Sequence, residues 1–182
     1  MARRGVLTSW NRWYELAGDA SFSKEPMTAN GHQFVRLELT GTFEMLDFVQ
    51  LVSDHVARGI GLDEEARHWL SVAIRESVIN AIKHGNRNDA TKRVFVEFAT
   101  AAPADVPEVA IRIRDQGEGF NPALVANPLD PENLLKSSGR GIFLIRSFMD
   151  DVQWQRAPEG GMEIRMIKRV RPAAANDSGS GA

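Results

Sequence analysis

The segment from Asp63 to Gly85 carries signals for both ends of one helix. Asp63 is a typical N-cap residue, and Glu64 and Glu65 follow in the first turn, where the helix dipole favours acidic side chains. At the other end His84 is followed by Gly85, a residue common just after a helix. Because successive helical residues are about 100° apart, one stripe is predicted to face a core: Leu70, Ala73, Ser77 and Ala81.

Further helices and strands are predicted on both sides of this helix. An earlier helix is predicted to be capped by Thr42 and to end at Gly59, and a later one to run from Gly139 to about Asp150. The core positions expected on the earlier helix are Phe43, Leu46, Val49 and Val56. Residues 158–161 are predicted to turn between the last two strands. Strands are predicted over residues 34–40, 93–98, 108–114, 152–156 and 162–170.

The composition fits one globular domain with an addition at each end. The chain has 182 residues, of which 43% are hydrophobic and 25% charged, and these values exclude general disorder and fibrous repeats. We expect residues 34–170 to form the domain. Residues 1–33 are predicted to be a partly ordered extension, whose aromatic residues either dock on the core or a partner or belong to a loosely packed arm. Residues 171–182 are small and polar and are predicted to be disordered.

Charge and cysteine content limit the partners and the location. The formal net charge is −2 and neither sign is concentrated in a block, so we expect neither nucleic acid nor a membrane as a direct partner. The chain has no cysteine, which excludes disulfides, thiolate nucleophiles and iron–sulfur clusters. We expect no secretory signal, because no apolar run follows the two arginines near the start, and no stretch approaches the roughly 18 apolar residues of a membrane span. A cytoplasmic protein is therefore expected.

Glu76 and Asn80 are one turn apart at the edge of the apolar stripe, within about 40° of each other. A carboxylate and an amide oxygen at this spacing can share a hard cation and an activated hydroxyl group. The same pair can also be an ordinary contact on a helix surface, which is the commoner case for two such residues. Taken alone, the two residues leave both interpretations open.

Two glycine-containing motifs come later in the chain. Asp115 directly follows a predicted strand, and Gly117 and Gly119 would let the backbone approach a ligand or simply form a turn. Gly139 and Gly141 open a helix, whose N-terminus is a ready phosphate site or the hinge of a lid. The segment between them, about 120–138, contains three prolines and no regular period, and its length is typical of a lid or a binding loop.

In this order the three motifs resemble the N box and the two glycine boxes of the GHKL ATPases, the superfamily of gyrase, the heat-shock chaperones and the histidine kinases. The resemblance covers about residues 34–168. Within the superfamily, residues 76–85 (ESVINAIKHG) and 138–152 (SGRGIFLIRSFMDDV) are most similar to small bacterial anti-sigma factors that are also serine-protein kinases. The implied fold is α/β (α+β): a two-layer sandwich with helices on one face of a mixed, mostly antiparallel sheet. ATP would lie between the layers.

The resemblance also implies a role for each motif residue. Asn80 would bind Mg²⁺ that bridges the phosphates of ATP, Glu76 would act as the base for a seryl hydroxyl, and Asp115 would bind the adenine amino group. Lys83 and Arg140 would either meet a phosphate or stay in solvent. The implied ATP-binding residues are Asn80, Lys83, Asp115, Gly117, Gly119, Gly139, Arg140 and Gly141.

The function implied by the resemblance is that of an ATP-dependent serine-protein kinase and anti-sigma factor. Such a protein phosphorylates a STAS-type anti-anti-sigma protein, sequesters a sigma factor and forms a homodimer. The alternative is an ATP-responsive binding module with little or no kinase activity. A histidine kinase would need a phosphoacceptor histidine on a helical hairpin before the ATPase domain, and we expect too little chain there to form one. A topoisomerase or mismatch-repair ATPase would need a further domain.

Overall fold

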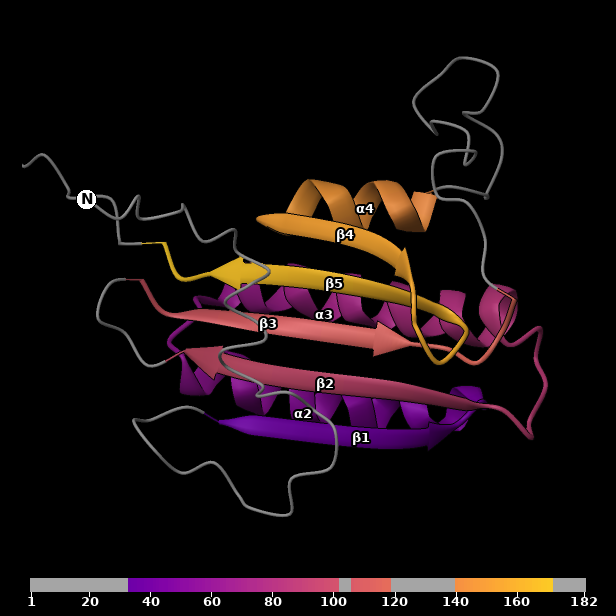
Figure 1. Cartoon of the computed structure of the whole chain (residues 1–182). Helices are drawn as coiled ribbons and strands as arrows, with labels where there is room; N and C mark the ends of the chain where they lie inside the picture. The colour runs from indigo at the N-terminus through magenta and orange to yellow at the C-terminus, as the bar shows by residue number, and fades with distance from the viewer. Residues whose placement is uncertain (1–32, 102–105, 119–139, 172–182) are drawn as a thin grey trace, which may run out of the picture.

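The computed structural model describes residues 33–101, 106–118 and 140–171 (Figure 1). Its five strands form one sheet in the order β1-β2-β3-β5-β4. All four neighbouring pairs are antiparallel, so the described part of the sheet has no parallel pair. The strands are β1 (Phe34–Thr40), β2 (Arg93–Ala101), β3 (Glu108–Arg114), β4 (Asp151–Arg156) and β5 (Met162–Arg169). The predicted bounds of β1 and β3 are confirmed, and β2 extends three residues beyond its predicted end.

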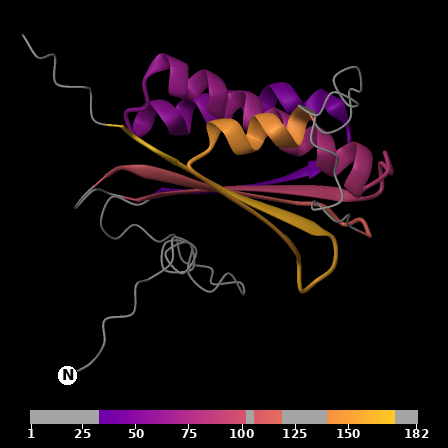
Figure 2. The ribbon, with the colours of Figure 1, turned by 90° about the horizontal axis from the view of Figure 1, so that it is seen from above.

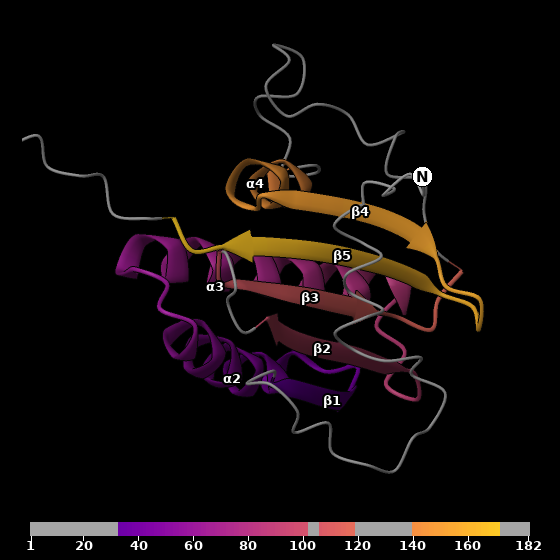
Figure 3. The same ribbon diagram turned by 60° about the vertical axis from the view of Figure 1, so that its left-hand side comes forward.

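Three helices cover one face of the sheet (Figure 2). They are α2 (Leu46–Gly59), α3 (Glu64–Asn80) and α4 (Arg140–Phe148). Figure 3 shows α2 on the side of β1 and α4 on the side of β4. The predicted two-layer α/β sandwich is therefore confirmed. Among the described residues, no helix is both long and apolar enough to span a membrane.

The core lies between the two layers. Alternate residues of the central strands point toward the helices, as the period of a half-covered strand requires. The predicted core stripe is confirmed, since Leu70, Ala73 and Ser77 of α3 and Ala81 directly after it are all buried. These helical residues pack against buried strand side chains that include Val96, Phe98, Ile111, Ile113 and Met166.

Helix α3 begins as predicted and ends differently. The Asp63 carboxylate accepts a hydrogen bond of 2.7 Å from the amide of Ala66, which confirms the N-cap. The α-helical part stops at Asn80 and continues as a π-helical turn, η2 (Ala81–Gly85). Single π turns inside helices are frequent at functional sites. This one directly follows the motif residue Asn80.

The predicted helix before α3 is present, and Leu46, Val49 and Val56 are buried as expected, but both of its ends differ from the prediction. Thr42 makes no side-chain cap, and its hydroxyl lies 3.4 Å from that of Thr40. The first turn is a 3₁₀ turn, η1 (Phe43–Met45), whose three residues per turn take Phe43 off the core stripe and leave its side chain 46% exposed. At the other end Gly59 is still helical, and Gly61 takes the left-handed conformation with φ of 86°.

The face of the sheet away from the helices carries a row of buried charges. Glu97 on β2 pairs with Arg36 at 2.6 Å and with Arg112 at 2.5 Å. Glu163 on β5 pairs with Arg165 at 2.6 Å and with Arg112 at 3.5 Å. The two carboxylates are 3% and 1% exposed. The row links β1, β2, β3 and β5 through side chains, in addition to the hydrogen bonds of the sheet.

Three predicted segments fall mostly or entirely outside the described residues. They are the N-terminal extension 1–33 except Gln33, the lid at about 120–138, and the tail 171–182 except Arg171. The domain boundaries therefore remain predictions.

Candidate functional site

The first half of the site is formed where α3 meets the start of α4. Glu76 and Asn80 come from the last turns of α3, and both are half-buried. A Cβ atom built on Gly141 would lie 2.5 Å from Glu76 Oε2 and 3.6 Å from Asn80 Nδ2. Within the described part of the chain, neither polar side chain has a hydrogen-bond or ion-pair partner. The structure therefore brings the three predicted residues to one place and leaves both side chains available for a ligand.

The second half of the site is the Asp115 carboxyl group at the end of β3. Asp115 is 4% exposed, and its Oδ1 accepts hydrogen bonds from the amides of Gly117 (2.8 Å) and Met162 (3.0 Å). No described group hydrogen-bonds Oδ2. Burial raises the pKa of Asp115, and the two amide hydrogen bonds oppose that rise. A buried oxygen without a donor is costly, so Oδ2 marks a place where a ligand can donate a hydrogen bond.

Three glycines let the backbone pass close to Asp115. A Cβ on Gly85 would overlap the Asp115 carboxyl group, and one on Gly117 would overlap the Gly85 carbonyl group. Gly161 in the β4–β5 turn has φ of 90°, and a Cβ there would overlap the Asp115 carbonyl oxygen. The sequence pointed to Gly117 and assigned Gly161 only to a turn. Met162 contributes its backbone amide, for which no side-chain signal exists.

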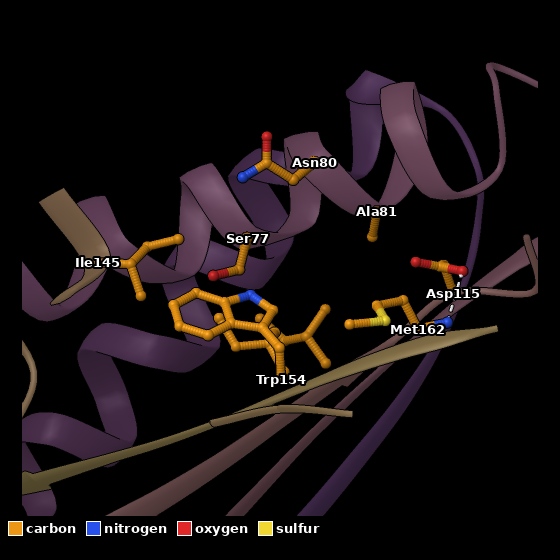
Figure 4. Close-up of a pocket in the computed structure, with 9 residues that line it drawn as sticks. Ser77, Asn80, Ala81, Asp115, Ile145, Trp154 and Met162 are labelled. Atoms are coloured by element: carbon orange, nitrogen blue, oxygen red, sulfur yellow. Dashed lines mark hydrogen bonds between the residues drawn. The ribbon is translucent and has the colours of Figure 1, made fainter. Parts of the chain in front are cut away.

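A pocket between α3 and the sheet joins the two halves (Figure 4). Ser77, Asn80 and Asp115 are its polar residues. Its apolar walls are formed by Ala81, Ile113, Ile145, Trp154, Met162 and Ile164. An apolar pocket with a few fixed polar groups is suited to a flat heterocycle that carries a hydrogen-bond donor.

The other predicted site residues are less completely placed. Lys83 is exposed on η2, and Arg140 is exposed at the first residue of α4. Gly119 and Gly139 lie outside the described residues, as does the lid between them. The roles assigned to all these residues remain predictions.

A metal ion at this site would depend on the nucleotide for most of its ligands. The described residues contain no cluster of three or more His, Cys, Asp or Glu side chains that could hold an ion. Asn80 offers one neutral oxygen, and Mg²⁺ commonly binds through one or two protein ligands together with phosphates and water. The side chains present therefore fit an ion that arrives with a nucleotide.

A second, larger hollow lies at the opposite end of α3 and contains none of the motif residues. Trp69 of α3 stacks on Phe148 of α4 there, with 3.5 Å between ring centroids. Lys168 Nζ donates a hydrogen bond of 2.7 Å to the Phe148 carbonyl oxygen. These contacts join α3, α4 and β5 at this end of the helix layer.

Comparison with known proteins shows the family of the chain. Residues 42–168 match the model of the histidine kinase-like ATPase domain. The chain is 25% identical over 147 residues to the serine-protein kinase RsbW of Oceanobacillus iheyensis, covering 78% of this chain and 89% of the relative. It is 27% identical over 152 residues to RsbW of Staphylococcus epidermidis, covering 80% and 92%.

Two further matches differ in extent. The anti-sigma F factor of O. iheyensis is 34% identical over 105 residues, which are 56% of this chain and 68% of the relative. The solved structure of the RsbU and RsbW domains of Rv1364c from Mycobacterium tuberculosis has a TM-score of 0.54 at 20% identity. That match covers 78% of this chain and 34% of the longer chain, and it supports the fold.

Proposed function

Because the chain belongs to the histidine kinase-like ATPase family, we propose that it binds ATP in the pocket between α3 and the sheet and transfers the γ-phosphoryl group to a serine of a partner protein. The observation that carries this proposal is the meeting of Glu76 and Gly141 with Asn80, which lines a pocket that also contains Asp115. The names of the relatives, serine-protein kinase and anti-sigma factor, support the same activity.

Asp115 would select the base. Its Oδ2 atom has no described donor, while Oδ1 is fixed by two backbone amides. The adenine amino group can donate to Oδ2, whereas guanine presents a carbonyl oxygen at that position. A site that leaves a buried acceptor unsatisfied discriminates strongly against the ligand that lacks the donor. The pocket is therefore expected to prefer ATP to GTP.

The other end of the pocket would hold the phosphates. Asn80 would contribute its amide oxygen to Mg²⁺, which supplies charge neutralisation on the phosphate oxygens when it is bound. Gly117 and Gly119 would allow the chain to pass the nucleotide, and Gly139 and Gly141 would place backbone amides on the phosphates. Lys83 and Arg140 would add positive charge near them.

Glu76 would act on the acceptor serine. As the seryl oxygen forms its bond to the γ-phosphorus, the bond from that phosphorus to the β,γ-bridging oxygen breaks and ADP leaves. The seryl proton moves to the Glu76 carboxylate. Phosphoryl transfer depends mainly on positioning and charge stabilisation, with proton removal as a smaller contribution.

The proposed partners are a sigma factor and a STAS-type anti-anti-sigma protein that carries the acceptor serine, and the proposed state is a cytoplasmic homodimer. In this scheme nucleotide and partner stabilise one conformation, and phosphorylation of the antagonist ends its binding. The relatives named as kinase and as anti-sigma factor support this scheme.

The proposal is tested by Glu76→Gln, which keeps the shape of a side chain that has no described partner. We expect ATP–Mg²⁺ affinity within about twofold of wild type in calorimetric titration, and GTP should bind much more weakly. Transfer from labelled ATP to STAS proteins of the same organism should fall by a factor of about 10² or more. Full transfer by the variant would exclude Glu76 as the base. ATP binding without transfer by the wild type would favour the binding module.

A further inference from the structure

Asn86 is a fully buried polar residue that the roles above do not use. It directly follows η2 and is 0% exposed. Its Nδ2 donates a hydrogen bond of 3.0 Å to the Arg93 carbonyl oxygen, at the start of β2. Its Oδ1 accepts one of 2.9 Å from the amide of Gln116. One side chain thus joins the end of the motif helix, the start of β2 and the loop after β3.

Gln116 completes this arrangement from the other side. Its Oε1 accepts a hydrogen bond of 2.7 Å from the amide of Arg93. The carboxamides of Asn86 and Gln116 therefore engage both polar backbone groups of Arg93, and the Asn86 oxygen engages the backbone of Gln116. We refer to Asn86, Gln116 and the Arg93 backbone that they bind as the carboxamide clamp.

The clamp adjoins the group that would read the base. Gln116 lies between Asp115 and Gly117, and the Gly117 amide is one of the two donors that fix Asp115 Oδ1. Gly117 also packs so closely on the Gly85 carbonyl group that a Cβ would not fit. A shift of residues 116–117 would therefore change both the direction of the Asp115 carboxylate and its contact with η2.

We infer that Asn86 is a positioning residue for nucleotide recognition: through the carboxamide clamp it holds the Asp115 loop in the orientation that accepts the amino group of a 6-aminopurine nucleotide. This inference rests on the proposed ATP site. Loss of the clamp would reduce the fraction of molecules with Asp115 correctly oriented, and the apparent Kd rises in inverse proportion to that fraction. A nucleotide that makes no bond to Asp115 would lose much less.

The test compares ATP with inosine triphosphate, which has an oxo group in place of the amino group, by calorimetric titration of the full chain with Mg²⁺. In Asn86→Ala we expect the Kd for ATP to rise about tenfold, the loss typical of a buried hydrogen-bonded group. The Kd for inosine triphosphate should change less than about twofold, so the preference for ATP falls. If Asn86 had a purely structural role, the substitution would weaken the binding of both nucleotides equally.

Two more variants complete the design. Arg87→Ala is the matched control, because it breaks an exposed ion pair of 2.7 Å between Arg87 and Glu118 that joins the same two loops. Its two side chains are 73% and 76% exposed, and the preference should stay at the wild-type value. Gln116→Ala removes the hydrogen bond between the Gln116 side chain and the Arg93 amide. Because Gln116 is exposed, the preference for ATP over inosine triphosphate should fall only about threefold. If circular dichroism shows that Asn86→Ala does not fold, the ATP preference of Gln116→Ala tests the inference instead.

The outcomes separate the two proposals. If the wild type does not bind ATP, the proposed function fails and the inference fails with it. If the wild type prefers ATP and both clamp variants keep that preference, the inference alone is overturned. An equal loss of affinity for both nucleotides overturns it as well.

Discussion

Gly141 faces the Glu76 carboxylate with no room for a side chain between them: a Cβ at position 141 would lie 2.5 Å from Glu76 Oε2. The first turn of α4 and the last turns of α3 therefore approach each other at the place where the proposed chemistry occurs. Contacts between these two helices, including the stacking of Trp69 on Phe148, maintain this approach.

Gly141→Ala should separate activity from stability. Alanine is favoured over glycine in a helix by about 1 kcal/mol, so the melting temperature should hold or rise. The added methyl group would displace Glu76, and transfer of phosphate should fall at least tenfold, because small displacements of a catalytic group are costly. Thermal unfolding and a transfer assay measure the two effects. Gly160→Ala is the control: φ of 90° strains alanine there, but no atom lies within 4 Å, so transfer should not change.

Asp115→Asn should change the base preference. The asparagine oxygen would take over the hydrogen bonds from Gly117 and Met162, which places the amide NH₂ at the position of Oδ2. A donor then faces the adenine amino group, and the Kd for ATP should rise about 10- to 100-fold. Nucleotides with a 6-oxo group should gain affinity. Titration with ATP and GTP measures both changes, and retained ATP preference would exclude Asp115 as the base-reading residue.

The raised pKa of Asp115 gives ATP binding and stability opposite dependences on pH. Protonation removes the acceptor at Oδ2, so ATP affinity should fall as the pH drops through the raised pKa, at a higher pH than for an ordinary aspartate. The folded state binds this proton more tightly than the unfolded state. The contribution of Asp115 to stability is thus full below its unfolded pKa and is lost as the pH rises through the folded pKa. Both dependences should be smaller in Asp115→Asn, measured by titration and urea unfolding across the acid range.

Glu163→Ala should destabilise the fold. The substitution removes a carboxylate that is 1% exposed from its ion pairs with Arg112 and Arg165. Breaking a buried ion pair by removing one partner costs about 3 kcal/mol or more. Glu38→Ala is a control on β1, because its pair with Arg93 spans 3.7 Å and its side chain is 61% exposed. That change should cost about 0–1 kcal/mol in urea unfolding.

The local features of the fold were predictable from the sequence. The cap at Asp63, the core stripe of α3 and the bounds of β1 and β3 depend on residues near each other in the chain, and all were confirmed. The motif residues Glu76, Asn80 and Gly141 were identified because their residue types and order resemble a known set. The start of α2 was wrong because a 3₁₀ turn and an α-helical turn fit the same apolar pattern over three residues.

Only the tertiary structure decided how the segments meet around Asp115. Its carboxyl group is fixed by the Met162 amide, 47 residues away, and the neighbouring Gln116 amide is fixed by Asn86, 30 residues away. Every residue except proline carries a backbone amide, so the sequence pattern cannot single out Met162 as a donor. The burial of Asn86 likewise follows from its position between the start of β2 and the loop after β3, which no local period encodes. The sequence alone therefore determined the chemistry that is available, and packing determined which groups are held in place to use it.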